Sequence, residues 1–367
     1  MAIENGKTPL ELGFRMPAEW ERHEGTWLGW PSNASDWPGK FAAIPWVYAE
    51  IVRLLSQREW VHILVQDEAQ QRRAASILKR AGANLALVSF HAWPTNRVWL
   101  RDSGPIFVKN AAGQTAITNW KFNAWAKYDD WQLDDQVPEH VAGLLGLPQW
   151  QPTVALADGS ERRLVPRRLV LEGGSIDVNG AGTLITTEEC LLSEIQQRNP
   201  GVSREQLEQA FNDYLGIEQV LWLDRGVAGD DTHGHVDDIT RFVGPSTIVT
   251  AIESNTADDN HAPLAENLAR LKASRTPDGK QWTIVELPLP RPVVFGGQRL
   301  PASYANFYIA NELVLMPTFH DPNDRVALGI LAELFPDREV IGIHSVDLVW
   351  GLGTLHCMTQ QQPTAGI

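Results

Sequence analysis

The two cysteines of the chain lie in different surroundings. Cys357 ends the stretch GLGTLHC (residues 351–357), in which glycines loosen the backbone and His356 is the immediate neighbour. Cys190 lies in TTEECLL (residues 186–192), an apolar stretch typical of a buried structural cysteine. A thiol in a polar turn, with a histidine and carboxylates elsewhere in the chain, is a recognised but unspecific nucleophile pattern. Cys357 is therefore the candidate nucleophile, and Cys190 is expected to be structural.

A second candidate cluster places His233, His235 and Asp237 at alternate positions. In an extended strand these side chains share one face, which suits either a metal site or a histidine paired with a carboxylate. The metal interpretation lacks support elsewhere, since Asp238 stands where the metal-binding pattern His-x-His-x-Asp-His has its last histidine. A surface turn with a hydrogen-bonded histidine is the structural alternative.

Asp102, in WLRDSGP (residues 99–105), and Glu172, in EGGS (residues 172–175), supply further carboxylates. Asp102 could simply cap a turn or pair with Arg101. However, carboxylates, an imidazole and a thiol together form a complete set for attack on a guanidinium group, which paired carboxylates bind bidentately. A thiolate attacks the central carbon, a histidine protonates the departing ammonia, and water completes the hydrolysis. This chemistry requires no metal.

The elements that must position these residues repeat along the chain. Each unit contains two strand-like runs joined by a tight turn, a helical stretch, and a single β-rich run. Asn179-Gly180 is the strongest of the hairpin signals. The predicted hairpins span residues 106–118, 175–186, 239–250 and 306–316.

The stretches with helical spacing are followed by β-rich runs. Helices are predicted at residues 41–57, 68–81, 262–273 and 325–335, and one or two helices around Pro200 at residues 191–215. Strands are predicted at residues 61–65, 85–88, 220–223, 283–287 and 340–344. An N-terminal unit around residues 27–37 brings the number of units to five. No linker interrupts the series, so residues 1–367 are expected to form one α/β domain.

Polar residues mark the start of successive units: Asp102, Gly174, His235 and Asn306, with Cys357 further on. Their similar spacing is typical of a repeated supersecondary module that stacks or closes on itself. If the array closes into a ring, these polar clusters converge on one central cleft.

The composition limits the class of protein. The chain has 367 residues, with 45 acidic and 31 basic side chains and a net charge of −14. The acidic balance and the lack of a basic cluster argue against a nucleic-acid partner and fit a cationic small molecule better. No apolar run is long enough for a membrane span, and the N terminus lacks signal-peptide features, so a cytoplasmic protein without a membrane partner is expected.

Nine motifs together resemble the agmatine deiminase family, the branch of the guanidino-group-modifying pentein superfamily that includes bacterial peptidylarginine deiminases. The motifs run in order along nearly the whole chain. They are RMPAEWE (15–21), HEGTWLGWP (23–31), WLRDSGP (99–105), FNAW (122–125), DDQVP (134–138), EGGS (172–175), GHVD (234–237), ASYANFYIAN (302–311) and HCMTQQQP (356–363).

The resemblance implies a role for each candidate residue. Cys357 would be the nucleophile that forms a covalent amidino-thioether, and His235 the general acid and then base. Asp102 and Asp237 would hold the guanidinium, while Glu172 would orient His235. A bound cation and a protonated His235 would both favour the thiolate.

The resemblance also implies the fold, the substrate and the assembly. The fold would be a five-module α/β propeller with pseudo-fivefold symmetry, and Trp99 would line the alkyl chain of the substrate. The expected reaction is hydrolysis of agmatine to N-carbamoylputrescine and ammonia, a step toward putrescine. No cofactor or metal is implied, and a homo-oligomer is expected.

Several positions depart from the family pattern. Arg97 stands where an acidic residue is usual, residues 351–354 read GLGT instead of Gly-Gly-Gly-Asn, and His233 and Asp238 replace asparagines. A cation at position 97 would repel the ammonium of agmatine and attract a carboxylate. Free arginine or a C-terminal peptidyl arginine therefore remains open as substrate. A metal-dependent hydrolase built on His233, His235 and Asp237, and a non-catalytic binding protein, are the alternatives from other classes.

Overall fold

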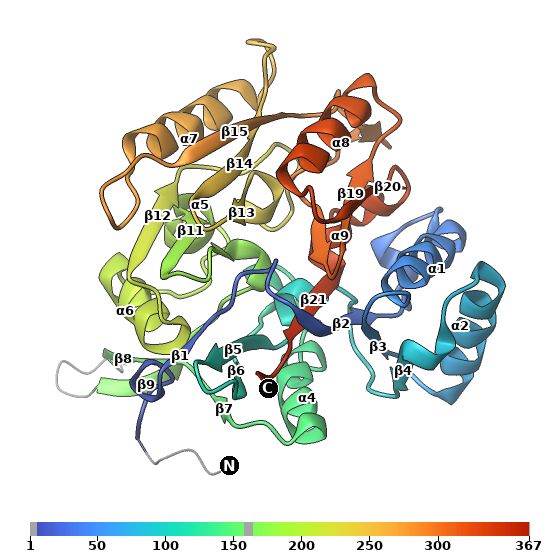
Figure 1. Ribbon diagram of the computed structural model, residues 1–367, viewed down its shortest axis with the longest axis horizontal. Helices are drawn as coiled ribbons and strands as arrows, with labels where there is room; N and C mark the ends of the chain where they lie inside the picture. Colours follow the sequence, from blue (N-terminus) through green and yellow to red (C-terminus); the bar gives the residue numbers. More distant parts are fainter. Residues whose placement is uncertain (1–5, 158–163, 367) are drawn as a thin grey trace.

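The computed structural model describes residues 6–157 and 164–366 of the chain. Within these residues, five α/β modules are arranged in a ring (Figure 1). The sheet of each module combines an antiparallel strand pair with a strand that runs parallel to its neighbour. The predicted α/β propeller with its hairpin, helix and strand units is therefore confirmed.

The first module joins the two ends of the chain. Strand β21 pairs antiparallel with β2, so that Trp27 lies opposite Gln360. The expected N-terminal unit thus exists, but its antiparallel partner comes from the C-terminal end of the chain. The elements of this module are β21 (Thr359–Pro363), β2 (His23–Gly29), α1 (Ile44–Leu55), β3 (Trp60–Leu64), α2 (Glu68–Ala81) and β4 (Val88–His91).

The second module begins with the short helix that carries Asp102. Its elements are α3 (Leu100–Ser103), β1 (Phe14–Arg15), β5 (Ile106–Asn110), β6 (Thr115–Thr118), α4 (Val137–Leu145) and β7 (Gln149–Trp150). The predicted β5–β6 hairpin is present, whereas α4 was not predicted. Pro138 in the first turn of α4 and Gly146 at its C-cap, with φ of 64°, mark its two ends.

The remaining three modules follow the predicted units closely. The third contains β10 (Asp177–Val178), β11 (Thr183–Thr187), α5 (Glu188–Leu192), α6 (Arg204–Leu215) and β12 (Gln219–Leu223). The fourth contains β13 (Thr240–Gly244), β14 (Thr247–Ile252), α7 (His261–Ala273) and β15 (Thr283–Pro288). The fifth contains β18 (Tyr308–Ala310), β19 (Leu313–Thr318), α8 (Pro322–Leu334), β20 (Glu339–His344) and α9 (Leu355–Met358), the short helix that carries Cys357.

Local signals explain where the helices begin and end. Helix α2 has the predicted bounds because the Asp67 side chain accepts a hydrogen bond from the Gln70 amide and Gly82 ends the helix with φ of 83°. The run predicted as a strand at residues 85–88 is instead a 3-10 turn, Leu85–Leu87, followed by β4. There the Asn84 side chain caps the turn by accepting from the Ala86 amide.

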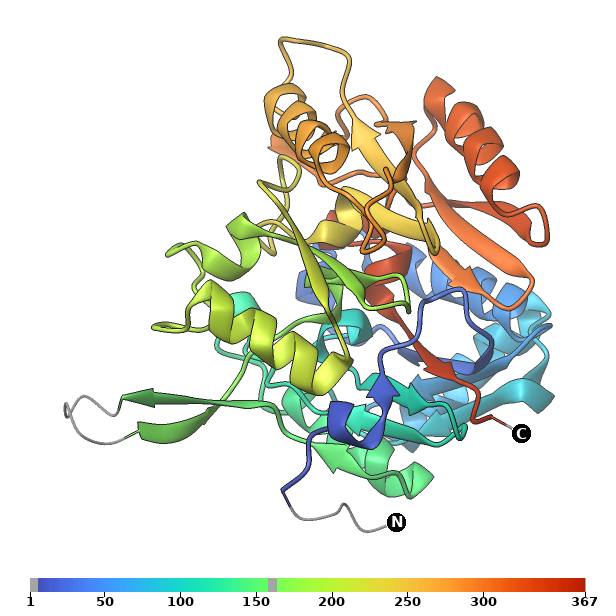
Figure 2. The same ribbon diagram turned by 60° about the vertical axis from the view of Figure 1, so that its left-hand side comes forward.

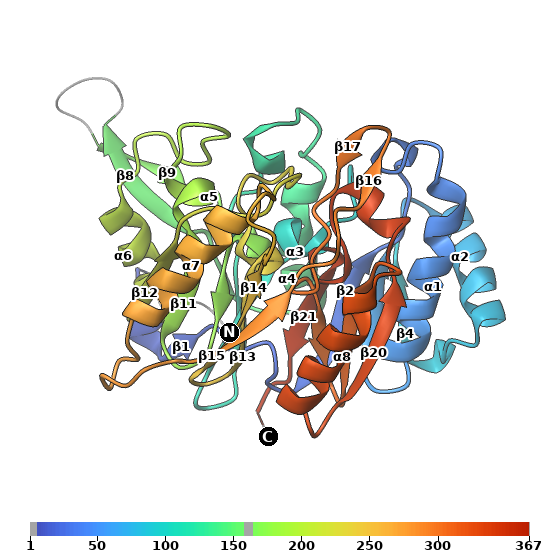
Figure 3. The ribbon, with the colours of Figure 1, turned by 90° about the horizontal axis from the view of Figure 1, so that it is seen from above.

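Two further hairpins extend from the ring. The hairpin of β8 (Thr153–Ala157) and β9 (Leu164–Arg168) projects from its side (Figure 2). The hairpin of β16 (Val294–Phe295) and β17 (Gln298–Arg299) lies at the end of the ring opposite the C terminus (Figure 3). No helix in the described ranges has the length and apolar character that crossing a membrane requires.

A buried carboxylate lies where the modules meet. Glu19 belongs to the segment between β1 and β2, which crosses the middle of the ring in Figure 1. Its side chain contacts Arg101 at 3.4 Å, Arg241 at 2.9 Å and His356 at 2.8 Å, and it accepts a hydrogen bond from the Ile309 amide. Burial alone would raise the pKa of Glu19, but Arg241, His356 and Arg101 hold it well below its usual value. This ion cluster links several modules beneath the candidate site.

Candidate active site

The residues singled out from the sequence form one buried cluster, and Trp99, Asp102 and Cys357 among them line a pocket. Short helical turns at the starts of the modules present them. Asp102 lies in α3, Glu172 precedes the 3-10 turn Gly173–Ser175, and His235 precedes the 3-10 turn Val236–Asp238, which contains Asp237. Cys357 lies in α9, and all five residues are buried. The ring therefore brings side chains from distant parts of the sequence into one cluster.

His235 lies between two carboxylates. Its Nδ1 is 3.7 Å from Asp102 Oδ1, and its Nε2 is 3.7 Å from Glu172 Oε2. Burial alone would lower the pKa of His235, but Asp102, Cys190 and Glu172 raise it well above its usual range. These partners favour the protonated imidazole, which is the form that a general acid requires.

Glu172 is fixed from behind by a buried arginine. The Nε of Arg198 donates to Glu172 Oε1 at 3.1 Å, and both side chains are fully buried. Burial would raise the pKa of Glu172, but Arg198 and His235 lower it to about 2. Glu172 is thus an ionised carboxylate that faces the imidazole.

Asp102 is held by two donors. The Trp125 indole donates to Oδ2 at 2.8 Å, and the Gly174 amide donates to Oδ1 at 3.0 Å. Burial raises the pKa of Asp102 to about 6, with Asp237 and Glu172 acting in the same direction. A bound cation would relieve this unfavourable burial of negative charge.

Asp237 faces the nucleophile. Its Oδ2 is 3.8 Å from Cys357 Sγ and 2.6 Å from His356 Nδ1. Burial alone would raise the pKa of Asp237, but the hydrogen bond and charge of His356 lower it. Burial, Asp237, Asp238 and Asp102 raise the pKa of the Cys357 thiol well above its usual value. These effects favour the protonated form of the thiol.

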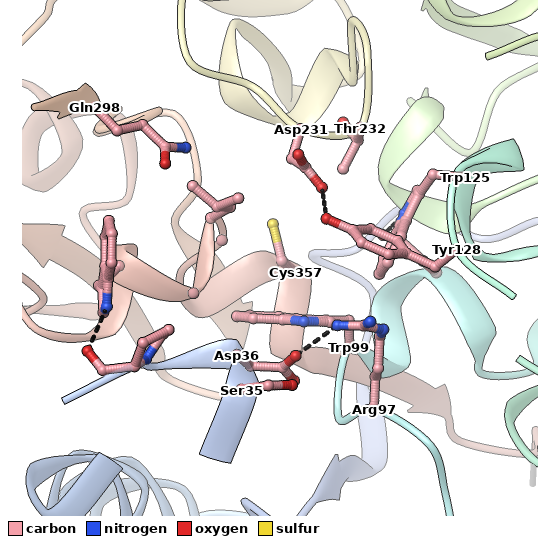
Figure 4. Close-up of a pocket in the computed structure, with 16 residues that line it drawn as sticks. Ser35, Asp36, Arg97, Trp99, Trp125, Tyr128, Asp231, Thr232, Gln298 and Cys357 are labelled. Atoms are coloured by element: carbon pink, nitrogen blue, oxygen red, sulfur yellow. Dashed lines mark hydrogen bonds and ion pairs between the residues drawn. The ribbon is translucent and has the colours of Figure 1, made fainter. Parts of the chain in front are cut away.

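The pocket above Cys357 is a cavity of about 360 Å³ with aromatic walls. Trp99, Trp125, Tyr128 and Trp350 line it, and the Cys357 sulfur lies among the lining side chains (Figure 4). Trp99 packs in turn against Trp37, with ring centroids 5.4 Å apart. A flat apolar wall beside a buried thiol suits an alkyl chain that leads to a cationic head.

Arg97 also lines this pocket, but carboxylates occupy its guanidinium. Nη1 contacts Asp36 Oδ1 at 2.5 Å, and Nη2 contacts Asp130 Oδ1 at 3.1 Å. The guanidinium carbon lies 4.3 Å from the centroid of the Tyr128 ring. Figure 4 shows Arg97 beside Trp99 and bound to Asp36. Arg97 is therefore a neutralised part of the wall and not a free cation.

The stretch GLGT (residues 351–354), which departs from the family pattern, keeps glycine at the two positions where a side chain would clash with its neighbours. A Cβ on Gly351 would lie 2.5 Å from Trp37 Nε1, and one on Gly353 would lie 2.9 Å from Trp99 and 3.3 Å from Cys357 Sγ. Leu352 has φ of 68°, in the left-handed region that favours glycine. The leucine is therefore the strained member of the stretch.

The alternate spacing of His233, His235 and Asp237 does not correspond to a strand. His233 has φ of 63° and Gly234 has φ of 95°, so the backbone turns, and residues Val236–Asp238 form a 3-10 turn. The His233 side chain contacts Ser193 at 3.2 Å. The expectation that these side chains share one strand face is therefore wrong.

Two groups of potential metal ligands occur in the part of the chain that the structure describes, each with ligand atoms within 4.8 Å of one another. They are Glu172 with Cys190 and His235, and Asp237 with Asp238 and Cys357. His233 belongs to neither, so the metal set suggested by the sequence is not assembled.

Sequence reasoning did not assign several residues that shape the site. Trp125 and Asn306 lie in motifs quoted for the family resemblance, and His356 was noted only as a neighbour of Cys357. Cys190 is a buried helical residue as expected, but its sulfur also lies beside Glu172 and His235. No periodicity or spacing marks this contact, because α5 and the His235 turn meet only in the folded ring.

Fold and site together define a class of protein: a five-module α/β propeller with a pocket lined by Cys357 and Asp102, next to which His235 and Asp237 are buried. Residues 15–363 match the sequence model of the Porphyromonas-type peptidyl-arginine deiminase family. The chain belongs to this family of guanidino-group-hydrolysing enzymes.

Individual relatives point to agmatine deiminases. An agmatine deiminase of Ectopseudomonas mendocina is 34% identical over 379 residues, which cover 97% of each chain. The solved structure of the agmatine deiminase of Enterococcus faecalis has a TM-score of 0.88 and 30% identity, and covers 100% of both chains. A C. jejuni agmatine deiminase solved with substrate bound has a TM-score of 0.82 and 27% identity, covering 96% of this chain and 97% of the other.

Proposed function

We propose that this chain is a single-domain deiminase that hydrolyses agmatine to N-carbamoylputrescine and ammonia. One observation carries the proposal: Cys357 and Asp102 line an aromatic pocket, with Asp237 3.8 Å from the Cys357 sulfur and His235 3.7 Å from Asp102. This set binds a planar cation and supplies both a nucleophile and a proton donor.

Binding and activation are coupled in this proposal. The bound guanidinium brings a positive charge between Asp102 and Asp237. The carboxylates of these two residues hold the guanidinium. The same charge offsets the carboxylates that raise the pKa of the Cys357 thiol. The thiol then releases its proton to solvent, and the thiolate adds to the guanidino carbon.

His235 acts in both halves of the reaction. In the first half it gives its proton to the departing nitrogen, so that ammonia leaves and an amidino-thioether remains on Cys357. In the second half the neutral imidazole takes a proton from water, which attacks the same carbon and expels the thiolate. Glu172, fixed by Arg198, orients the ring.

The charges at the pocket mouth favour an amine tail over a carboxylate tail. Asp36 and Asp130 bind Arg97, while Asp231 binds Lys127. These three carboxylates and two cations leave one net negative charge. An ammonium group therefore meets a weakly attractive field and a carboxylate a weakly repulsive one.

Arg97 supports a second candidate in the same class. If its ion pairs open, its guanidinium could bind the carboxylate of free arginine or of a C-terminal peptidyl arginine. Such an enzyme would use the same thiol chemistry. It would differ only in how the pocket mouth binds the end of the substrate that lies away from the guanidinium.

A colorimetric assay for the ureido product distinguishes the candidates. Agmatine, arginine and a peptide ending in arginine are tested side by side, in the presence of chelator, with Cys357→Ser as the blank. Product from agmatine alone supports the proposal. Product from arginine or the peptide alone selects the second candidate, and activity abolished by chelator would favour metal chemistry.

The proposal also includes a homo-oligomeric assembly and a cytoplasmic location. The family resemblance implies the homo-oligomer, and size-exclusion chromatography with light scattering tests it. Both cysteines are free thiols, in keeping with the reducing cytoplasm.

A further inference from the structure

Asn306 is a fully buried residue that holds the nucleophile turn. It precedes β18, and its side-chain oxygen accepts three hydrogen bonds from the segment that carries Cys357. The donors are Thr354 Oγ1 at 2.7 Å, the His356 amide at 3.0 Å and the Cys357 amide at 3.4 Å. Because all three groups donate, they fix which end of the carboxamide is the oxygen.

The carboxamide nitrogen must then face the other way. It donates to Cys357 Sγ at 3.1 Å and to Asp238 Oδ1 at 3.0 Å. An amide NH₂ group has two hydrogens, so each has one acceptor. The carboxamide is thus fully used, and one of its two N–H bonds points at the reacting sulfur.

Most of the remaining environment opposes the thiolate, although a backbone hydrogen bond from Thr354 lowers the pKa of the thiol. Asp237, Asp238 and Asp102 all disfavour negative charge on Cys357. Of the side chains that the structure describes, Asn306 and Asp237 are the two that hydrogen-bond to the sulfur, and only Asn306 is a donor there. A donor to an ionised acceptor forms a stronger hydrogen bond than one to a neutral acceptor, so this contact strengthens as the thiol ionises.

We propose that Asn306 is a further catalytic residue, whose carboxamide N–H stabilises the Cys357 thiolate while its oxygen fixes the turn on which the cysteine lies. Asp238 positions the carboxamide by accepting its second hydrogen. The catalytic part of this inference rests on the proposed deiminase reaction. The effect on the thiol does not, since it exists without substrate.

The test measures the ionisation of Cys357 directly. Alkylation by iodoacetamide is followed as a function of pH, and mass spectrometry of the Cys357 peptide separates this thiol from Cys190. Asn306→Ala should raise the apparent pKa of alkylation by about one unit or more, so that alkylation at a fixed pH below it slows roughly tenfold.

Steady-state kinetics with agmatine give a second readout. The Asn306 carboxamide nitrogen bonds to Cys357 and Asp238, and not to Asp102 or Asp237, which are proposed to hold the guanidinium, so KM should change little in Asn306→Ala. The value of kcat should fall about tenfold or more, because a smaller fraction of Cys357 is present as the thiolate. A defect in KM alone would overturn the assignment.

Two further variants keep the test decisive. Asn306→Asp has the same shape and keeps an oxygen for the three donors, but it loses the N–H and adds a negative charge beside the sulfur, which acts on the thiol pKa in the same upward direction. It should shift the pKa of the thiol upward like Asn306→Ala, even if the alanine variant does not fold. Asn267→Ala is the matched control, since Asn267 is also fully buried and bonds the Asp224 amide and the Arg225 carbonyl in the fourth module.

The outcomes separate this inference from the proposed function. An unchanged thiol pKa in both Asn306 variants overturns the inference, as does an equal shift in Asn267→Ala. If the wild-type protein releases no ureido product but Asn306→Ala still raises the thiol pKa, the proposed reaction fails and the role of Asn306 at the sulfur stands.

Discussion

Gly174 occupies the space where the side chains of His235, Asp102 and Asp237 meet. A Cβ built on it would lie 2.6 Å from His235 Nδ1, 2.7 Å from Asp102 Oδ1 and 3.0 Å from Asp237 Oδ2. Ordinary van der Waals contacts of a Cβ begin at 3.4 Å, so Gly174→Ala must displace these groups by up to 0.8 Å. Gly174 is absent from the residues with positive φ, so alanine meets no backbone strain there.

The expected loss is in activity more than in stability. A displacement near 1 Å at reacting groups costs about 100-fold in rate, and kcat/KM for agmatine should fall by about this factor. The groups that move are side-chain ends, so the free energy of unfolding should fall by no more than about 1–3 kcal/mol.

Release of the ureido product and unfolding in urea measure the two quantities on the same preparations. Gly143→Ala is the control, because a Cβ there meets nothing within 4 Å in helix α4. It should leave kcat/KM unchanged and stabilise the protein by about 0.5–1 kcal/mol. A folded Gly174→Ala protein with wild-type kcat/KM would refute the reasoning.

Three other perturbations follow from the same geometry. Cys357→Ser should abolish turnover and leave agmatine affinity measurable by calorimetry, whereas Cys190→Ser should change both little; equal losses would contradict these assignments. Because burial raises the pKa of Asp102 to about 6, that carboxylate becomes protonated below this pH, and kcat/KM should fall as the pH drops through 6; a profile without this fall counts against its binding role. Glu19→Gln removes the carboxylate paired with buried Arg101 and one of the two paired with buried Arg241, and should lower the free energy of unfolding by about 3–5 kcal/mol in urea titrations. Glu21→Gln removes a half-exposed surface pair and should lower it by about 1 kcal/mol or less in the same measurement; similar losses in both variants would argue against the buried cluster.

Much of the fold could be predicted because its signals are local. The Asn179-Gly180 turn between β10 and β11, and the caps of α2, lie within a few residues of the elements they define. The pairing of β2 with β21 carries no such signal, because its two strands lie at opposite ends of the chain. Helix α4 was missed although its Pro138 and Gly146 signals were present.

The residue types of the candidate site could be predicted from the sequence. The contacts that hold those residues in place could not. Cys357, His235 and the carboxylates stand out because they recur at the starts of successive units. The contact of Asn306 with the sulfur depends on how α9 packs against the loop before β18, which no spacing reveals. The His233 interpretation failed because two residues with positive φ turn the backbone where alternation had suggested a strand.

The covalent intermediate tests the central claim most directly. The protein is mixed with agmatine, quenched in acid during turnover, digested, and examined by mass spectrometry, with Cys357→Ser treated identically. An adduct with the mass of agmatine less ammonia on the Cys357 peptide, absent from the serine variant, is the predicted result. Ureido product formed at full rate by Cys357→Ser would contradict the account.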